Sequence, residues 1–267
     1  RLQIIESLTR LGAKRGVSAA ADLLASKSLA LRQHVLEYLT ATDTERIAME
    51  RVVAALSNEP SEQLLPAYVA YFKSNPTRDD AAARALAELA GKNRLAFTEQ
   101  RDLIRTIGEV APIGHKPSIT TLTAIIEATE NAGELEIAAA LSLDALGDRD
   151  GIKQVDRRLD QLVKRSRNDA EALATRANWE RERGEWRAAI RDYESAIKAS
   201  KSSSSQAMYH LQIARCEAHR GKWSRVRASL KDSGLGRRTI EREAANDPEF
   251  AKALEKDTVR KYLESLE

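Results

Sequence analysis

The sequence predicts an all-α protein, an α-α superhelix (solenoid) of stacked helical hairpins. Residues that favour helix, such as Ala, Leu, Glu and Arg, dominate the 267-residue chain, whereas aromatic residues make up only 4% of it. Apolar residues recur at helical spacing in blocks of roughly ten to sixteen residues. The few glycines and prolines fall between these blocks, as they do between helices.

The first part of the chain reads as a series of predicted helices. Their apolar stripes cover residues 2–11, 31–39, 47–56, 64–72, 83–90, 103–110, 119–126, 135–146 and 152–163. Ser61 is the expected N-cap after one break, and Asp79 or Asp80 opens the helix that follows Pro76. Pro112 stops another helix.

These helices fall into pairs. Leu39, Phe72, Val110 and Leu146 occupy similar places near the end of a first helix, about 33 to 38 residues apart. The clearest pair covers 137–163, where an alanine-rich helix ends in Leu-Gly-Asp before a second apolar helix. This pair resembles a HEAT repeat, and the others match it in periodicity. We therefore expect residues 1–167 to form a HEAT-like helical repeat domain.

Two later stretches, 170–199 and 207–231, repeat one pattern. Both stretches carry small or apolar residues, a glycine and a tryptophan at matching spacings. The first has Ala177, Gly184, Trp186, Ala189, Tyr193 and Ala196, and the second has Ala214, Gly221, Trp223, Val226, Leu230 and Ser233 in the same order. The pattern resembles the tetratricopeptide (TPR) helix-turn-helix from Asn168 to about Ser233.

The pattern departs from the TPR family in places. Leu173 and His210 replace its usual tryptophan, Arg176 stands where leucine is common, and Lys201 holds the proline position. The turn glycines are 37 residues apart because Ser202–Ser205, expected to be a polar linker, lengthens the connection.

The tail, residues 239–267, predicts one or two further helices that cap the last open face. Asp247 is the expected N-cap and Pro248 the first helical residue. Gly234-Leu235-Gly236 reads as a helix terminus. Residues 168–267 are therefore expected to form TPR-like repeats with a C-terminal capping helix.

Motifs for chemistry are missing from the sequence. The single cysteine, Cys216, excludes an internal disulfide and reads as a buried structural thiol. The histidines are far apart and none belongs to a metal-ligand motif. We expect no enzymatic activity, no metal and no cofactor. The longest apolar run falls short of the ~20 residues that span a bilayer, and the start at Arg1 leaves the compartment unassigned.

Charge is unevenly placed along the chain. Residues 1–148 hold 16 Lys+Arg against 20 Asp+Glu, and residues 149–267 hold 27 against 20, which gives −4 and +7. The basic part points to an acidic partner; a solvated helical surface of mixed charge is the alternative.

The TPR resemblance implies a peptide groove lined by the first helix of each unit. The matching positions are Glu171, Ala174, Asn178, Arg181 and Glu182, then Met208, Leu211, Arg215, Ala218 and His219. The candidate peptide-binding residues are Asn178, Arg181, Arg215 and His219. Asparagine at the first position holds a peptide backbone or carboxylate in the family, and arginine can bind a carboxylate through two bonds. Ordinary solvent-facing helix residues are the competing interpretation.

The expected function is a protein–protein interaction scaffold or adaptor that binds a partner protein or acidic peptide. Binding of a nucleic-acid backbone by the Arg-rich stretches 149–191 and 215–242 is the rival, and carboxylates interrupt the first stretch: Asp156, Asp160, Glu180, Glu182 and Glu185. A regulatory or spacer arm of a longer protein is the third possibility.

Overall fold

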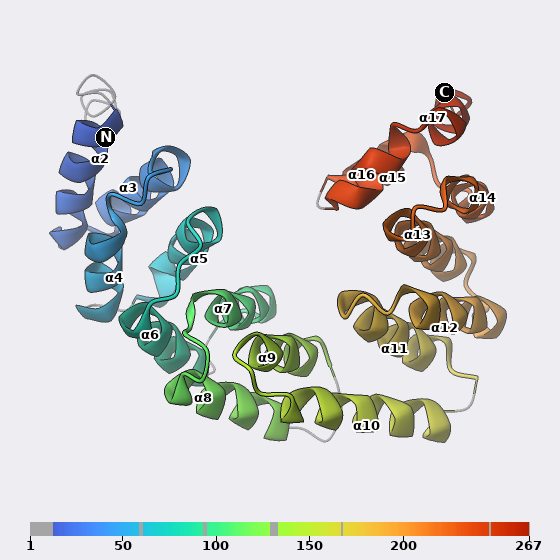
Figure 1. Ribbon diagram of the computed structural model, residues 1–267, viewed down its shortest axis with the longest axis horizontal. Helices are drawn as coiled ribbons and strands as arrows, with labels where there is room; N and C mark the ends of the chain where they lie inside the picture. The colour runs from blue at the N-terminus through green and yellow to red at the C-terminus, as the bar shows by residue number, and fades with distance from the viewer. Residues whose placement is uncertain are drawn as a thin grey trace. The chain divides into compact units, whose positions relative to one another are not determined.

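A computed structural model describes residues 13–58, 61–92, 95–128, 133–166, 168–245 and 247–266. Within these ranges the chain forms sixteen α-helices and two short 3-10 helices, and none of the described residues lies in a β-strand (Figure 1). The predicted all-α class is confirmed. The predicted helix at 2–11 lies outside the described residues.

The chain divides into two compact units, residues 1–155 and 156–267, so the division falls inside helix α10 (Asp150–Arg165). The predicted domain boundary after residue 167 lies beyond the end of α10 and stays a prediction.

The first unit follows the predicted series of helices. Its elements are α2 (Ala13–Asp22), η1 (Leu23–Ala25), α3 (Leu29–Thr42), α4 (Met49–Asn58), η2 (Glu62–Leu64), α5 (Leu65–Ser74), α6 (Asp80–Gly91), α7 (Phe97–Val110), α8 (Lys116–Glu127), α9 (Glu134–Ala145) and the start of α10. Every predicted span from residue 31 to 163 overlaps one of these helices. Helix α2 was not predicted, because two of the three buried apolar residues described in it, Val17, Ala20 and Ala21, are alanines.

Helices of the first unit pack in two rows, which Figure 1 lets the reader follow. Helices α3, α5, α7 and α9 contact one another in succession, and α2, α4, α6 and α8 do the same. Leu39, Phe72, Val110 and Leu146 are all buried in the last turn or just past the end of the helices in the first row, so their predicted equivalence fits this arrangement.

One glycine sets how closely two helices of a row approach. A Cβ on Gly108 in α7 would stand 2.8 Å from the Cα of Ser142 in α9. The Ser142 hydroxyl, in turn, donates to the Ile104 carbonyl of α7 at 2.9 Å. Glycine is needed here because a side chain would push the two backbones apart.

Hairpin turns in the first unit are tied to the next hairpin by hydrogen bonds. The Asp79 amide donates to the Val110 carbonyl and the Gly114 amide to the Leu146 carbonyl, both at 2.9 Å. Asp79 also caps α6 as predicted, since its Oδ1 accepts from the Ala82 amide at 2.8 Å. The predicted Ser61 cap is wrong: its side chain makes no capping bond at the start of η2.

The second unit contains the two predicted hairpins and the tail. Its elements after α10 are α11 (Ala170–Glu182), α12 (Trp186–Ala199), α13 (Ser203–His219), α14 (Trp223–Ser233), α15 (Arg237–Ala244), α16 (Pro248–Leu254) and α17 (Asp257–Glu264). Helix α11 packs on α12 and α13 on α14. Gly184 and Gly221 turn the chain within each hairpin at φ of 75° and 67°, a left-handed conformation that favours glycine.

Small residues predicted at the helix contacts are buried. Ala177 and Ala189 lie in one core cluster with Tyr193 and Cys216, where α11, α12 and α13 meet. The prediction of a buried structural thiol is confirmed for Cys216, and burial raises its pKa to about 12. A thiol held neutral in this way packs as a small apolar side chain.

The linker and the tail differ from the prediction in detail. Ser202–Ser205 is not a linker: Ser202 caps α13, its hydroxyl accepting from the Ser205 amide at 3.3 Å, and the helix begins at Ser203. The tail forms three short helices, not one or two. Asp247 caps α16 and Pro248 is its first residue, both as predicted.

The tail covers the second hairpin. Helix α16 packs on α13 and α17 on α14. Phe250, Val259 and Leu263 are buried in one core with Leu211 and Leu230. This arrangement agrees with the expected capping role.

Candidate peptide-binding site

The predicted groove positions on α11 and α13 are only partly open to solvent. Glu171, Asn178, Glu182 and Met208 are exposed. Leu211 and Ala218, in contrast, are 0% and 1% exposed, because they belong to the core under the tail helices. Ala174 is buried as well. Leu211, Ala218 and Ala174 therefore do not line an open groove, and their prediction as groove residues is wrong.

Asn178 is oriented by a buried tyrosine. The Tyr193 hydroxyl of α12 donates to Asn178 Oδ1 at 2.6 Å. With its carbonyl oxygen engaged, the Asn178 side chain offers its two N–H donors to any further partner. Donors of this kind fit a peptide carbonyl or a carboxylate, as the resemblance implied.

Arg181 lies largely inside the protein. It contacts the Tyr193 hydroxyl and Glu182, with an Nη2–Oε1 distance of 3.3 Å to the latter. Burial alone would lower its pKa, but Tyr193 and Glu182 outweigh burial and leave the pKa raised. Arg181 therefore supports Tyr193 and α11, and it is poorly placed to meet a ligand.

Arg215 and His219 bind a carboxylate that belongs to the chain itself. Arg215 Nε lies 3.0 Å from Asp247 Oδ2, and His219 Nε2 lies 3.1 Å from Asp247 Oδ1. Asp247 also accepts from the Phe250 amide at 3.1 Å and is only 5% exposed. Burial raises the pKa of Asp247, yet these bonds and Arg215 outweigh it and hold the pKa below its usual range.

The four candidate residues thus fall into two groups. Asn178 and Arg181 meet at Tyr193, and Arg215 and His219 meet at Asp247. The ring of His219 also stacks on Trp186, with ring centroids 4.2 Å apart. Of the four residues, Asn178 is exposed and keeps both of its amide N–H donors for a ligand.

Sequence reasoning missed a polar seam between α10 and α11. Asp156 accepts from Trp179 Nε1 at 2.7 Å and from Arg183 Nη1 at 2.8 Å. One turn later, Asp160 forms an ion pair with Arg176, and Arg176 forms a second ion pair with Asp192 of α12. The available signal was the i, i+4 spacing of the two aspartates on one helix face.

Glu180 of α11 lies in the same region and has an unusual pKa. Burial, with Asp192 nearby, raises its pKa to about 7. Its Oε2 atom is buried and has no hydrogen-bond partner among the described residues. The ionised form of Glu180 is therefore disfavoured in the folded protein.

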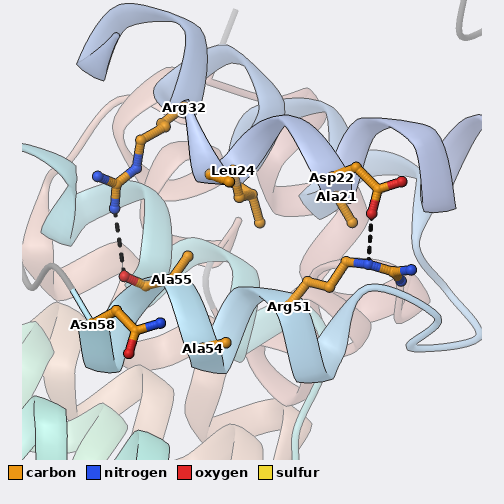
Figure 2. Close-up of a pocket in the computed structure, with 9 residues that line it drawn as sticks. Ala21, Asp22, Leu24, Arg32, Arg51, Ala54, Ala55 and Asn58 are labelled. Carbon is orange, nitrogen blue, oxygen red and sulfur yellow. Dashed lines mark hydrogen bonds and ion pairs between the residues drawn. The ribbon is translucent and has the colours of Figure 1, made fainter. Parts of the chain in front are cut away.

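A cleft in the first unit is lined by two arginines and several alanines (Figure 2). It has a volume of about 450 Å³. Arg51 pairs with Asp22 at 2.8 Å, and Arg32 donates to Tyr68 Oη at 3.0 Å and to the Ala55 carbonyl at 3.5 Å. Both guanidinium groups thus already hold neighbouring elements together.

Among the described residues, no three His, Cys, Asp or Glu side chains are grouped so that they could hold a metal ion. None of the described helices combines the length and apolar character that crossing a membrane requires. Comparison with models of known protein families, with curated proteins and with solved structures found no match to this chain.

Proposed function

We propose that this protein is an interaction scaffold or adaptor, without enzymatic activity, that holds a partner protein or peptide along a helical solenoid. The observation that carries the proposal is the packing of successive helices, α3 on α5, α5 on α7 and α7 on α9. Helices stacked in this way present their free faces as one extended surface, which repeat proteins use to dock other chains.

The repeat types are part of the proposal. The two rows of the first unit support HEAT-like hairpins. The left-handed turn glycines Gly184 and Gly221, with buried Ala177, Ala189 and Ala214, support TPR-like hairpins in the second unit. No other residue type adopts this turn conformation as readily.

The proposed contact with a peptide is made by Asn178. Its amide donors remain available once Tyr193 has engaged its oxygen. Glu171 and Met208 are exposed on α11 and α13, the helices whose faces carry the candidate positions. A peptide backbone on this face would receive hydrogen bonds from Asn178 and an apolar contact from Met208.

An Asn178→Asp variant tests this placement. The substitution keeps an acceptor for the Tyr193 hydroxyl but removes both donors and repels acidic peptides. We expect quantitative mass spectrometry of proteins that co-purify with the tagged chain to show partners lost at least ten-fold, a loss of about 1.4 kcal/mol. An exposed control, Ser224→Ala, should retain them. The same partners on both variants would reject the placement.

A nucleic acid is the second candidate partner, and one observation favours it. Several carboxylates that interrupt the basic stretch in sequence are engaged by arginines: Asp156 by Arg183, Asp160 by Arg176, and Glu182 by Arg181. A gel shift with duplex DNA and single-stranded RNA over a salt series tests it, since binding to phosphates must weaken steeply as salt rises.

A further inference from the structure

A groove in the second unit combines arginines with little opposing charge. Its lining runs from the α11–α12 turn through the first turns of α12 and includes Arg220 from the end of α13: Gly184, Glu185, Trp186, Arg187, Ala188, Arg191 and Arg220. Its volume is about 460 Å³. We call it the basic groove.

Two of its arginines are available to a ligand. Arg187 and Arg191 are exposed, and among the described residues neither guanidinium group has a hydrogen-bond or ion-pair partner. Glu180 of α11 acts on Arg191 through charge alone. They are four residues apart on α12, so they lie on the same helix face with side chains about 6 Å apart. Arg220 adds a third guanidinium, which Glu217 anchors at 2.9 Å.

Two carboxylates near the basic groove are paired with arginines. Glu185, which lines it, pairs with Arg183 at 2.9 Å. Glu217 is buried between Arg220 and Arg225. With Glu185 and Glu217 paired in this way, the exposed guanidinium groups of Arg187 and Arg191 leave the groove surface positive.

We propose that the basic groove docks an acidic segment of a partner protein, with carboxylates of the segment paired to Arg187 and Arg191. The inference rests on the proposed scaffold function and names the chemistry of its partner. It also replaces the predicted role of Arg215 and His219, which Asp247 occupies. Exposed guanidinium groups favour carboxylates because they can form two charge-assisted hydrogen bonds with each.

A peptide fits the basic groove better than a nucleic acid does. The three arginines surround one short groove, whereas a nucleic-acid backbone needs a long track of cations. Base stacking needs exposed aromatic side chains, and within the described part of the second unit the one large apolar side chain that is exposed is Met208.

Fluorescence anisotropy with the full chain tests the proposal with two labelled probes, a ten-residue poly-glutamate peptide and ten-nucleotide poly-uridine RNA. The groove variant is Arg187→Glu with Arg191→Glu. The matched control is Arg227→Glu with Lys231→Glu on α14, which is also exposed, has the same i, i+4 spacing and changes net charge equally. Circular dichroism and thermal unfolding confirm that both variants fold.

We expect poly-glutamate to bind the wild-type chain, at least ten-fold weaker binding to the groove variant, and less than a three-fold change for the control. Equal weakening of both variants would mean general charge attraction and would overturn the proposal. So would the absence of peptide binding, or RNA binding that is tighter than peptide binding and depends on the groove.

Different results would reject the scaffold function and the basic groove. If the groove variant still captures the partners that Asn178→Asp loses, the basic groove is rejected and the scaffold function stands. If poly-glutamate binds the basic groove but tagged wild-type chain enriches no protein over a tag-only control, the scaffold function is rejected and the groove chemistry remains.

Discussion

Asp43 illustrates how individual buried carboxylates are used in this protein. Its Oδ1 accepts from the Ile47 amide at 2.6 Å and its Oδ2 from the Ala48 amide at 2.9 Å, just before α4 begins. The Tyr71 hydroxyl adds a third bond at 2.7 Å, and burial with the Asp43 contact raises the pKa of Tyr71. Asp43 follows the end of α3 and thus connects it with the start of α4 and with α5. Amides near the start of a helix have no partner within the helix and need acceptors such as this carboxylate.

At the residue scale, Glu180→Gln is expected to stabilise the protein at alkaline pH. With a folded-state pKa of about 7, well above its ordinary value, the folded protein binds more protons than the unfolded chain between pH 4.5 and 7. Stability therefore falls as pH rises through this window. The neutral Gln avoids that loss, which solvent screening limits to about 1 kcal/mol.

Urea unfolding of both proteins at pH 8 and pH 5 measures this effect. The advantage of Glu180→Gln should be present at pH 8 and smaller at pH 5. Glu194→Gln, on the exposed face of α12, is the control and should show no such trend. An advantage that is equal at both pH values would contradict the role of Glu180 ionisation.

At the scale of elements, short helices depend on caps and neighbours. Helix α16 has only 7 residues, too few to be stable alone, and it begins at Asp247 and Pro248. Its cap bonds the Phe250 amide and also binds Arg215 and His219 of α13. One side chain therefore both starts the helix and attaches it to the preceding hairpin.

Asp247→Ala is expected to destabilise the second unit by about 2 to 4 kcal/mol, because it removes a cap and leaves Arg215 without its carboxylate. Since the pKa of Asp247 is lowered, its contribution is present at neutral pH and is lost as pH falls below its usual titration range near 4. Chemical unfolding at pH 7 and pH 3 measures both effects.

Asp257→Ala is the matched control for this cap. Asp257 is an exposed aspartate whose one ion pair within the described part of the chain is with Arg260, one turn on, at 2.8 Å. We expect a change of less than about 1 kcal/mol. Equal losses from the two substitutions would mean that Asp247 is no more than a surface charge.

At the scale of the whole molecule, each helix packs mainly against helices that are close to it in sequence. In the first unit α5 contacts α3 and α7, and in the second α13 contacts α12, α14 and α16. Stability in such a chain is a sum of local and nearest-neighbour terms, so it need not be uniform along its length.

Hydrogen exchange followed by mass spectrometry is expected to reveal this gradient. Helix α17, with α14 and α16 as its main neighbours, should exchange sooner than α13, which has neighbours on more sides. Helix α7, packed between α5, α6 and α9, should be among the slowest of the first unit. A single exchange rate for all helices would instead indicate one global unfolding unit.

Much of the helical framework could be predicted because its signals are local. Apolar spacing located α3 to α10, and paired glycines and alanines located the hairpins of α11 to α14. Helix α2 was missed because alanines blur its apolar stripe. The contacts of Arg215 and His219 with Asp247 were not predicted, since nothing in their local sequence reveals Asp247, 32 and 28 residues away.

The sequence by itself determined that the protein is helical, where most helices lie along the chain, and where the basic residues are concentrated. Only the tertiary structure decided which charges are paired and which remain at the surface. Arg176 and Arg215 engage internal carboxylates, whereas Arg187 and Arg191 do not. Helix formation depends on neighbours within one or two turns, but ion pairing depends on which helices meet, and that is settled by packing.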